Sequence, residues 1–335
     1  MYQTPFHSID ISKSRFLITG GAGFIGSNIV EYLLKYKAGK VTVLDNLSTG
    51  FEENIQPYFT HPAFQFIKGD ICNFEDCKKA CEGIDYVFHQ AALGSVPRSI
   101  KNPQATNSVN VDGFLNILVA ARDAKVKRVV YASSSSVYGD SKELPKIESN
   151  IGNALSPYAV SKCTNELYAN VFAHNYNMEI LGLRYFNIFG PRQNPKGEYA
   201  AAIPLFMEAI LTNKSPFING DGEQSRDFTF VENAVQANIK AMFATGEGIS
   251  GQVYNVAVGE KTSIKELFNI LKKLAGASVD AVHRENRSGD IRDSLADISK
   301  AKRLLTYDPK VNIQDGLKIT LNWFSSYFGY KFISK

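Results

Sequence analysis

The chain has 335 residues, of which 44% are apolar and 21% are charged. These proportions are typical of a soluble globular protein and exclude a disordered or fibrous chain, and the length suffices for one large domain or two smaller ones. The 37 basic and 33 acidic residues leave a net charge of +4 without a long run of either sign, so nucleic-acid binding has no electrostatic footprint here.

The N-terminal residues and the cysteines suggest the compartment. Residues 1–13 are expected to form an N-terminal arm, and they lack the apolar core that a signal peptide needs. No apolar run is long enough to span a bilayer. The cysteines are spaced too irregularly for paired zinc ligands and are expected to be reduced thiols. We therefore expect a cytoplasmic protein with no metal and no membrane partner.

The first predicted strand, residues 16–19, leads directly into a glycine-rich turn. The turn reads Gly20-x-x-Gly23-x-x-Gly26, and a helical pattern follows it through Leu34. Glycines at such a turn let backbone N–H groups approach a pyrophosphate at a helix N-terminus. A lone glycine motif is weak evidence, but its place between a strand and a helix favours a dinucleotide site over a loop that merely turns the chain.

The next predicted strand, residues 41–44, ends in Asp45, nineteen residues beyond Gly26. An acidic side chain at this position is suited to hold an adenosine ribose. It favours NAD over NADP, because a 2′-phosphate would be repelled.

Strands alternate with helical patterns over the rest of this half of the chain. Further strands are predicted at residues 64–68, 86–89 and 128–132. This alternation predicts an α/β fold with a Rossmann-like, doubly wound parallel sheet. Asp70-Ile71 and Gln90-Ala91-Ala92 follow two of the strands, at the carboxyl edge where ligands bind, and are expected to contact the adenine and the middle of the cofactor. His89 is expected to be a packed side chain without a catalytic role.

The strand at 128–132 runs into a cluster of hydroxyls, residues 133–136. Nothing near it supplies the histidine and acid that would make a serine nucleophilic. We interpret these serines as hydrogen-bonding groups for a ligand such as a sugar.

A tyrosine and a lysine lie one helical turn apart at the start of the next predicted helix. Ser156 can cap this helix, Pro157 suits its first turn, and Tyr158 and Lys162 face one way. A phenol with a pKa of about 10 is a poor base at neutral pH, but a nearby cation lowers that pKa. Lys162 and a positively charged nicotinamide would both act in this direction and produce a general base for an alcohol proton. Such a pair is common on solvated helix faces, so the dinucleotide motif is what favours a functional reading.

Prolines punctuate shorter elements beyond residue 186, which indicates a second region. Arg226 and Arg287 stand isolated in loop-like surroundings. Each is either a solvated surface residue or part of a fork that holds a diphosphate. We expect an N-terminal arm at 1–13, an NAD-binding domain at 14–185 with a returning segment near 228–258, and a smaller α/β substrate-binding domain from 186–227 and 259–335.

Seven segments together carry a family resemblance that spans nearly the whole chain. GGAGFIG with Asp45, SSSSVYG and YAVSK resemble the extended short-chain dehydrogenase/reductase superfamily. HQAALGSVPRSI, LRYFNIFGPRQNP, INGDGEQSRDF and SGDIRDSLADISKA are similar to nucleotide-sugar 4-epimerases that act on UDP-N-acetylhexosamines. The resemblance implies interconversion of UDP-N-acetylglucosamine and UDP-N-acetylgalactosamine with tightly bound NAD, for polysaccharide or lipopolysaccharide precursors. It also implies a homodimer.

The resemblance assigns roles to individual residues. Tyr158 is similar to the catalytic base, Lys162 to the residue that binds the nicotinamide ribose, and Ser134 to the hydroxyl that binds the sugar 4-oxygen. Cofactor contacts are implied for Gly20, Gly23, Phe24, Ile25, Gly26, Asp45, Asn46, Asp70, Ile71, Gln90, Ala91, Ala92, Asn110, Tyr158, Lys162 and Tyr185. Substrate contacts are implied for Ser134, Ser135, Asn187, Asn219, Arg226, Arg287 and Ser294.

Ser294 bears on the choice of sugar. Relatives restricted to unacetylated sugars carry a tyrosine there, and a serine would leave room for a 2-acetamido group. A small polar residue at a strand edge also needs no special explanation.

The implied reaction removes the proton of the sugar 4-hydroxyl through Tyr158 while hydride passes to NAD. The resulting 4-keto sugar turns about its diphosphate and takes the hydride back on its other face. Alternatives are 4-epimerases of UDP-glucose, of UDP-glucuronate or of UDP-N-acetylglucosaminuronic acid, since one more basic residue near the sugar, such as Arg98, Lys196 or Arg292, would suit a uronate. A dehydratase would need acidic residues beside the serines. A non-catalytic NAD-binding regulator is an alternative of another class.

Overall fold

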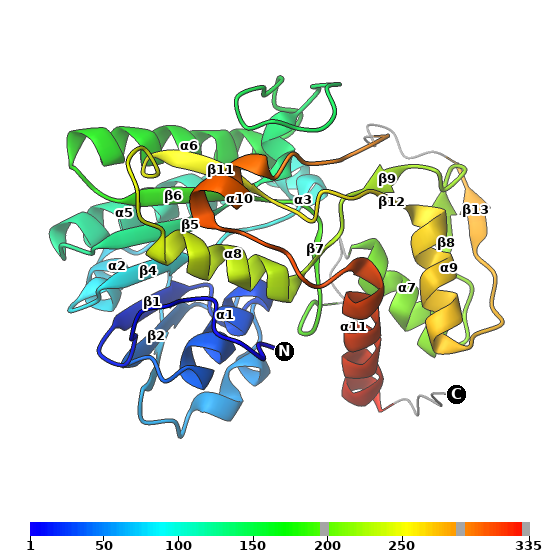
Figure 1. Ribbon diagram of the computed structural model, residues 1–335, viewed down its shortest axis with the longest axis horizontal. Coiled ribbons are helices and arrows are strands. Elements are labelled where there is room, and N and C mark those ends of the chain that lie inside the picture. Colours follow the sequence, from blue (N-terminus) through cyan, green and yellow to red (C-terminus); the bar gives the residue numbers. More distant parts are fainter. Residues whose placement is uncertain (195–200, 286–291, 330–335) are drawn as a thin grey trace.

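The computed structural model describes residues 1–194, 201–285 and 292–329. At its centre lies a sheet of seven parallel strands in the order β11-β6-β5-β4-β1-β2-β3 (Figure 1). The strands are β1 (Arg15–Thr19), β2 (Lys40–Asp45), β3 (Phe64–Lys68), β4 (Tyr86–His89), β5 (Arg128–Ser134), β6 (Ile180–Tyr185) and β11 (Gln252–Val256). The strand order reverses beside β1, where ligands bind in doubly wound folds. The predicted fold class is confirmed.

Helices cover both faces of this sheet. One face carries α2 (Phe74–Cys81), α5 (Gly113–Asp123) and α6 (Pro157–Asn175), and the other carries α1 (Phe24–Lys35) and α8 (Val231–Phe243) (Figure 1). Side chains of successive β1 residues pack into the apolar cores on opposite faces of the sheet, Phe16 and Ile18 into one core and Leu17 into the other. Burial on both faces explains why this strand is a continuous apolar run.

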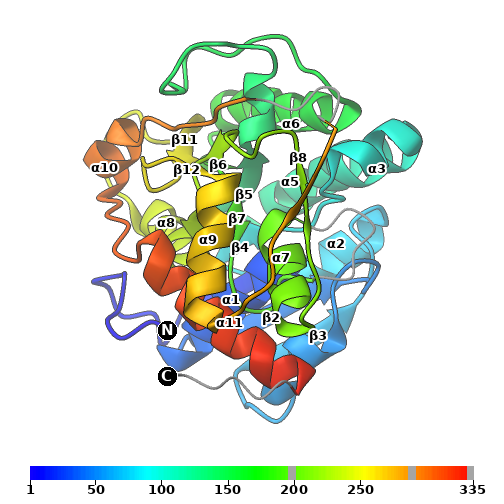
Figure 2. The same ribbon diagram turned by 90° about the vertical axis from the view of Figure 1, so that its right-hand side faces the viewer.

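A smaller lobe with its own apolar core lies at one end of the sheet. Figure 2 places its helices α7 (Ala202–Leu211), α9 (Ile264–Ala275) and α11 (Ile313–Phe328) toward the viewer. Its strands pair as β7 (Ile188–Phe189) with β10 (Thr229–Phe230), β8 (Phe217–Asn219) with β13 (Val282–Arg284), and β9 (Ser225–Arg226) with β12 (Thr262–Ser263). The strand candidate near 228–231 shortens to β10 because Val231 begins α8.

The remaining elements are short. They are the 3-10 helices η1 (Glu52–Asn54), η2 (Gln56–Tyr58) and η4 (Ser135–Tyr138), the π-helical turn η3 (Ser108–Asp112), and the helices α3 (Val96–Lys101), α4 (Pro103–Asn107) and α10 (Ser299–Leu305). Residues 296–307, which include α10, return to the larger core on the α8 face of the sheet.

The first thirteen residues pack onto the fold instead of extending from it. Tyr2 is fully buried, and its backbone nitrogen donates a hydrogen bond to the Glu232 Oε1 atom at 2.9 Å. The Phe6 ring stacks on the Tyr32 ring of α1 with centroids 5.2 Å apart. The segment therefore stabilises α1 and α8 against each other.

The predicted helix after Ser156 is α6, but its apolar residues do not share one environment. Phe172 is 6% exposed, whereas Leu167 is 69% and Val171 is 48% exposed. Only part of the apolar pattern thus faces the core. In the part of the chain that the structure describes, no helix combines the length and apolar character needed to cross a membrane.

Candidate active site

The glycine turn lies between β1 and the N-terminus of α1. Gly20 has a φ of +68°, and a Cβ there would lie 2.6 Å from the Ala91 backbone nitrogen. A Cβ on Gly26 would lie 2.2 Å from the Gly20 carbonyl oxygen. Glycine therefore permits this close approach of turn, helix and strand end. Gly23, the N-cap of α1, provides no side-chain cap, so the first N–H groups of the helix are suited to an anion.

A cavity of about 490 Å³ begins at this turn and follows the carboxyl edge of the sheet. Almost all residues predicted to bind the cofactor line it: Gly20, Gly23, Phe24, Ile25, Gly26, Asp45, Asn46, Asp70, Ile71, Gln90, Ala91, Ala92, Tyr158, Lys162 and Tyr185. Ser134 and Asn187 line the same cavity. The glycine cradle, the helix N-terminus and the carboxylates suit the diphosphate and ribose groups of NAD, so these residues fit that cofactor.

Asp45 joins the glycine turn to the end of β2. Its Oδ2 atom accepts a hydrogen bond from the Ala22 nitrogen at 2.9 Å, and its Oδ1 atom accepts one from the Leu47 nitrogen at 2.8 Å. Burial raises the pKa of Asp45, and these two N–H groups oppose that effect. Each carboxylate oxygen keeps a further lone pair toward the cavity, which a ribose hydroxyl could use.

Local sequence positions the predicted catalytic pair at the start of α6. The Ser156 Oγ atom accepts a hydrogen bond from the Ala159 nitrogen at 3.1 Å and caps the helix. Tyr158 and Lys162 follow one turn apart, and the Lys162 Nζ atom lies 5.9 Å from the Tyr158 ring centroid. Lys162 Nζ also donates a hydrogen bond to the Ala132 carbonyl oxygen of β5 at 2.8 Å. The ammonium is therefore fixed between the helix and the sheet.

Burial acts against the charged forms of both members of this pair. It raises the pKa of Tyr158, and the Ser134 hydroxyl opposes this. It lowers the pKa of Lys162 to about 8, with the Glu166 carboxylate opposing. Lys162 alone thus does not overcome the burial of the phenol. A second cation beside Tyr158 is needed for the general base that the sequence predicts.

Asn110 lies beneath the cavity, not in its wall, and connects the cofactor loop to α6. Its Oδ1 atom accepts a hydrogen bond from the Leu93 nitrogen at 2.7 Å, and its Nδ2 atom donates to the Ser161 Oγ atom at 3.1 Å. Ser161 in turn donates to the Tyr158 carbonyl oxygen at 2.8 Å. Asn110 belongs to η3, and such π-helical turns often occur at functional sites.

Tyr185 is held by a closed triangle of hydrogen bonds. The Asn238 Nδ2 atom donates to the Tyr185 hydroxyl at 2.7 Å, that hydroxyl donates to the Gln90 Oε1 atom at 3.1 Å, and Gln90 Nε2 donates to Asn238 Oδ1 at 3.0 Å. This triangle fixes one wall of the cavity. Sequence reasoning missed Asn238 because nothing local marks a helix residue that meets a strand end far away in the chain.

A second cavity, of about 410 Å³, shares Asn187, Ile188 and Gln193 with the first. Two predicted substrate ligands, Asn219 and Arg226, line it. The structure therefore brings the predicted substrate residues of the smaller lobe next to the predicted cofactor residues of the sheet.

Arg284 and Gln193 are among the cavity-lining residues that were not predicted. Arg284 lines the second cavity, donates from Nε to Asn219 Oδ1 at 2.6 Å and lies 5.2 Å from the Phe217 ring centroid. Gln193 lines both cavities, and its buried Oε1 atom has no hydrogen-bond partner among the described residues. No local pattern in the sequence singled out Arg284.

Besides Asn110, two predicted residues line neither cavity, and a third lies outside the described residues. Ser135 lies in η4, one residue beyond Ser134, and lines neither cavity. Ser294 is half-buried, donates from its backbone nitrogen to the Ser225 carbonyl oxygen at 3.1 Å and also lines neither. Arg287 lies outside the described residues. His89 is buried and hydrogen-bonded to Thr19 at 2.9 Å, as expected of a packed side chain.

Known proteins resemble this chain over nearly its whole length. Residues 16–257 match the NAD dependent epimerase/dehydratase family. A putative UDP-glucose 4-epimerase of Methanocaldococcus jannaschii is 38% identical and covers 92% of this chain and 97% of its own. A UDP-glucuronate 4-epimerase of Thermodesulfobacterium geofontis is 33% identical over 92% of this chain and 95% of its own. The solved UDP-N-acetylglucosamine 4-epimerase from Methanobrevibacter ruminantium M1, in complex with UDP-N-acetylmuramic acid, is similar with a TM-score of 0.89 and 40% identity, covering 94% of this chain and 99% of that chain.

Proposed function

Because this chain belongs to the NAD-dependent epimerase/dehydratase family, we propose that it interconverts UDP-N-acetylglucosamine and UDP-N-acetylgalactosamine. The chain is an NAD-dependent UDP-sugar 4-epimerase. The choice of an acetylated sugar is supported by its 40% identity to a solved UDP-N-acetylglucosamine 4-epimerase. That likeness is the observation that carries the proposal, since other relatives act on UDP-glucose or UDP-glucuronate.

The charges that line the first cavity favour a neutral sugar over a hexuronate. Among the described residues that line the first cavity, Lys162 is the one cation. Its ammonium group already donates a hydrogen bond to the Ala132 carbonyl oxygen. Arg98 does not line either cavity. Arg292 forms an exposed pair with Asp221, with both N–O distances at 3.0 Å. Lys196 lies outside the described residues.

The proposed chemistry divides between the two cavities. Tyr158 takes the proton of the sugar 4-hydroxyl, and Ser134 hydrogen-bonds the same oxygen. Arg226 and Asn219 hold the UDP portion while the 4-keto sugar turns between its two faces. When bound in the first cavity, NAD would provide the acceptor and donor of hydride for the sugar C4 atom. Lys162 orients the nicotinamide ribose and adds positive charge beside the phenol.

The two lobes are proposed to bind different ligands. Residues 14–185 with the returning segment near 228–258 would bind NAD, and residues 186–227 and 259–335 would bind the UDP-sugar. The exposed apolar side chains of α6, with Val160 53% and Leu167 69% exposed, support a homodimer through this helix. Light scattering of the purified protein tests it, because Leu167→Glu should then yield a monomer.

Proton NMR of the purified protein tests the substrate. UDP-N-acetylglucosamine, UDP-glucose and UDP-glucuronate are incubated separately, without added NAD. We expect UDP-N-acetylgalactosamine to appear, and to appear faster than the products of the other two sugars. Faster conversion of UDP-glucuronate would contradict the choice of sugar, and no conversion of any sugar by NAD-loaded protein would contradict the proposed chemistry.

A further inference from the structure

A largely buried carboxylate lies behind the catalytic pair and lines neither cavity. Glu166 follows Lys162 by one helical turn of α6 and Tyr158 by two turns, so the three side chains lie along one side of the helix. The Glu166 side chain is 13% exposed. A carboxylate at this depth needs partners that satisfy its charge.

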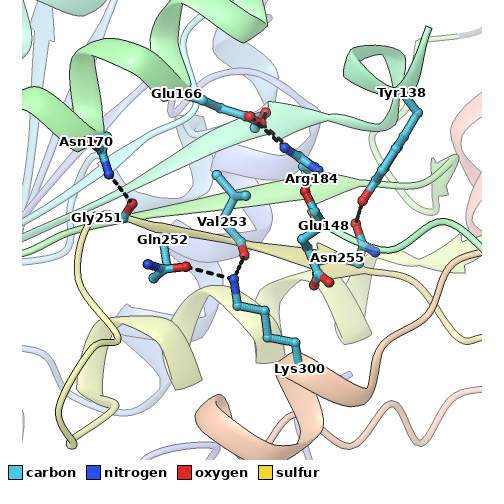
Figure 3. A network of polar contacts seen from close by, with 11 residues as sticks. Tyr138, Glu148, Glu166, Asn170, Arg184, Gly251, Gln252, Val253, Asn255 and Lys300 are labelled. Atoms are coloured by element: carbon cyan, nitrogen blue, oxygen red, sulfur yellow. Dashed lines mark hydrogen bonds and ion pairs between the residues drawn. The ribbon is translucent and has the colours of Figure 1, made fainter. Parts of the chain in front are cut away.

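Its partners come from two adjacent strands of the sheet. The Arg184 Nε atom donates to Glu166 Oε1 at 2.9 Å and its Nη2 atom donates to Oε2 at 2.8 Å. The Ser133 Oγ atom donates to Oε1 at 2.5 Å. Figure 3 shows the carboxylate of α6 facing the guanidinium of β6. Such a bidentate pair fixes the position of the carboxylate as well as its charge.

The guanidinium is itself fixed by a wider network. Arg184 is 3% exposed and donates from Nη1 to the Glu148 carbonyl oxygen at 2.9 Å. Its guanidinium carbon lies 4.9 Å from the Tyr138 ring centroid, and the Tyr138 hydroxyl donates to Asn255 Oδ1 at 2.6 Å (Figure 3). Contacts with Ser133 of β5 and Arg184 of β6 therefore fix the position of Glu166 relative to Lys162.

Three titratable groups close to Lys162 are neutral near pH 7, whereas Lys300 interacts electrostatically with Glu148, Glu166 and Arg184. Burial and the Lys162 charge lower the pKa of His89, on β4, to about 3. Burial raises the pKa of Tyr131, on β5, and of Cys163, on α6. Glu166 is the nearby charge that favours the protonated lysine.

We propose that Glu166 is a positioning residue for the epimerase reaction, whose fixed carboxylate keeps Lys162 protonated beside Tyr158. This inference rests on the roles proposed above for Tyr158 and Lys162. Its chemical consequence concerns pH. Burial alone favours neutral Lys162, and neutral Lys162 no longer stabilises the phenolate that accepts the sugar proton.

The test is the pH dependence of epimerase activity in Glu166→Gln, with NAD content measured at each pH. We expect activity to fall at a pH about one unit lower than in the wild type, because Lys162 loses a nearby opposite charge and gives up its proton more easily. Glu166→Asp keeps the charge and should restore most of the wild-type profile. Tyr138→Phe is the matched control, because it breaks a hydrogen bond of the same network without changing a charge, and its alkaline limb should not move.

Glu166→Gln leaves Arg184 without its counter-ion, and a buried unpaired charge is strongly destabilising. If that variant does not fold, Glu166→Gln combined with Arg184→Gln removes the pair together, and the alkaline limb should still move to lower pH.

A second readout is the near-ultraviolet absorbance of tyrosinate in the NAD-loaded protein, measured against Tyr158→Phe. Near pH 8 the ionised fraction of Tyr158 should fall in Glu166→Gln and in the double variant, because the charge of Lys162, one helical turn from Tyr158, is lost in both.

The outcomes separate this inference from the proposed function. An unchanged alkaline limb in folded, NAD-loaded Glu166→Gln, or in the double variant, would overturn the role of Glu166. A Tyr158→Phe protein that keeps its activity would instead overturn the assignment of the base.

Discussion

The Lys162 ammonium donates a hydrogen bond to the Ala132 carbonyl oxygen at 2.8 Å, which ties the cation of α6 to the strand that carries Ser134. The three predicted catalytic side chains thus belong to one rigid unit of helix and strand. Rigid support of this kind is what general acid–base chemistry requires, because proton transfer depends on closely held geometry.

Replacing Tyr158 with Phe should remove the general base and leave the cavity intact. We expect the turnover rate to fall by about 10²–10⁴-fold, with NAD still bound. NMR assays and cofactor released on denaturation measure the two effects. Tyr176→Phe, at the exposed end of the same helix, is the matched control and should keep full activity.

Replacing Gly26 with Ala should disrupt the cofactor cradle. The new Cβ would meet the Gly20 carbonyl oxygen at 2.2 Å, so the turn must shift, at a cost of about 3 kcal/mol. We expect lower thermal stability and loss of bound NAD, measured by calorimetry and by cofactor content. Full NAD content in the Gly26 variant would contradict this view of the cradle.

Activity should fall as pH rises through about 8, where Lys162 loses its proton. The loss would not arise from unfolding. The pKa of this lysine is lower in the folded protein than the value of about 10.4 for an exposed lysine, so the unfolded chain binds more protons between these values and this group makes unfolding harder as pH rises. Initial rates and the unfolding temperature, followed together from pH 6 to about 9.5, check both statements.

Replacing Arg226 with Ala should weaken substrate binding without releasing NAD. A charge-assisted hydrogen bond contributes about 1.5–3 kcal/mol, so we expect KM for the UDP-sugar to rise by about 10–100-fold. Titration calorimetry with UDP reports the same loss directly. Lys272→Ala serves as the control, because Lys272 pairs with exposed Asp280 at 2.6 Å in the same lobe and lines neither active-site cavity.

Asp85 should support stability at the opposite edge of the sheet. Burial would raise its pKa, but Arg15 at 3.0 Å and Lys127 at 3.1 Å hold that pKa at about 2. Its stabilisation is therefore present above about pH 4 and is lost as pH falls toward 2. Both partners are half-exposed or more, so we expect Asp85→Asn to cost about 1–2 kcal/mol at pH 7.

Urea unfolding at pH 7 and pH 3 measures this effect, which should shrink at the lower pH. Asp123→Asn removes an exposed ion pair with Arg122 and should change the free energy of unfolding by less than about 0.5 kcal/mol. An equal loss in both variants would show that the buried position of Asp85 does not matter. Epimerase activity of either variant should match the wild type at a temperature where both are folded.

Local patterns in the sequence were sufficient for strands β1 to β5 of the sheet and for the cofactor side of the site, but not for β6 and β11. The glycine turn after β1, Asp45 at the end of β2 and the pair in α6 could be predicted because each depends on residues that are neighbours in the chain. Backbone conformation, strand ends and helix faces follow from such short-range spacing. The carboxyl edge of a parallel sheet then collects these positions without further information.

Tertiary structure decided which distant side chains complete the site. Gln193 stands where the two cavities meet, and Asn238 meets Tyr185 across a separation of 53 residues. Glu166 likewise meets Arg184 through the packing of α6 on β6. Such contacts depend on how whole elements pack, and no local spacing encodes them. Sequence alone thus determined the fold, the cofactor and the reaction class, whereas packing decided the second cavity and the carboxylate behind the catalytic lysine.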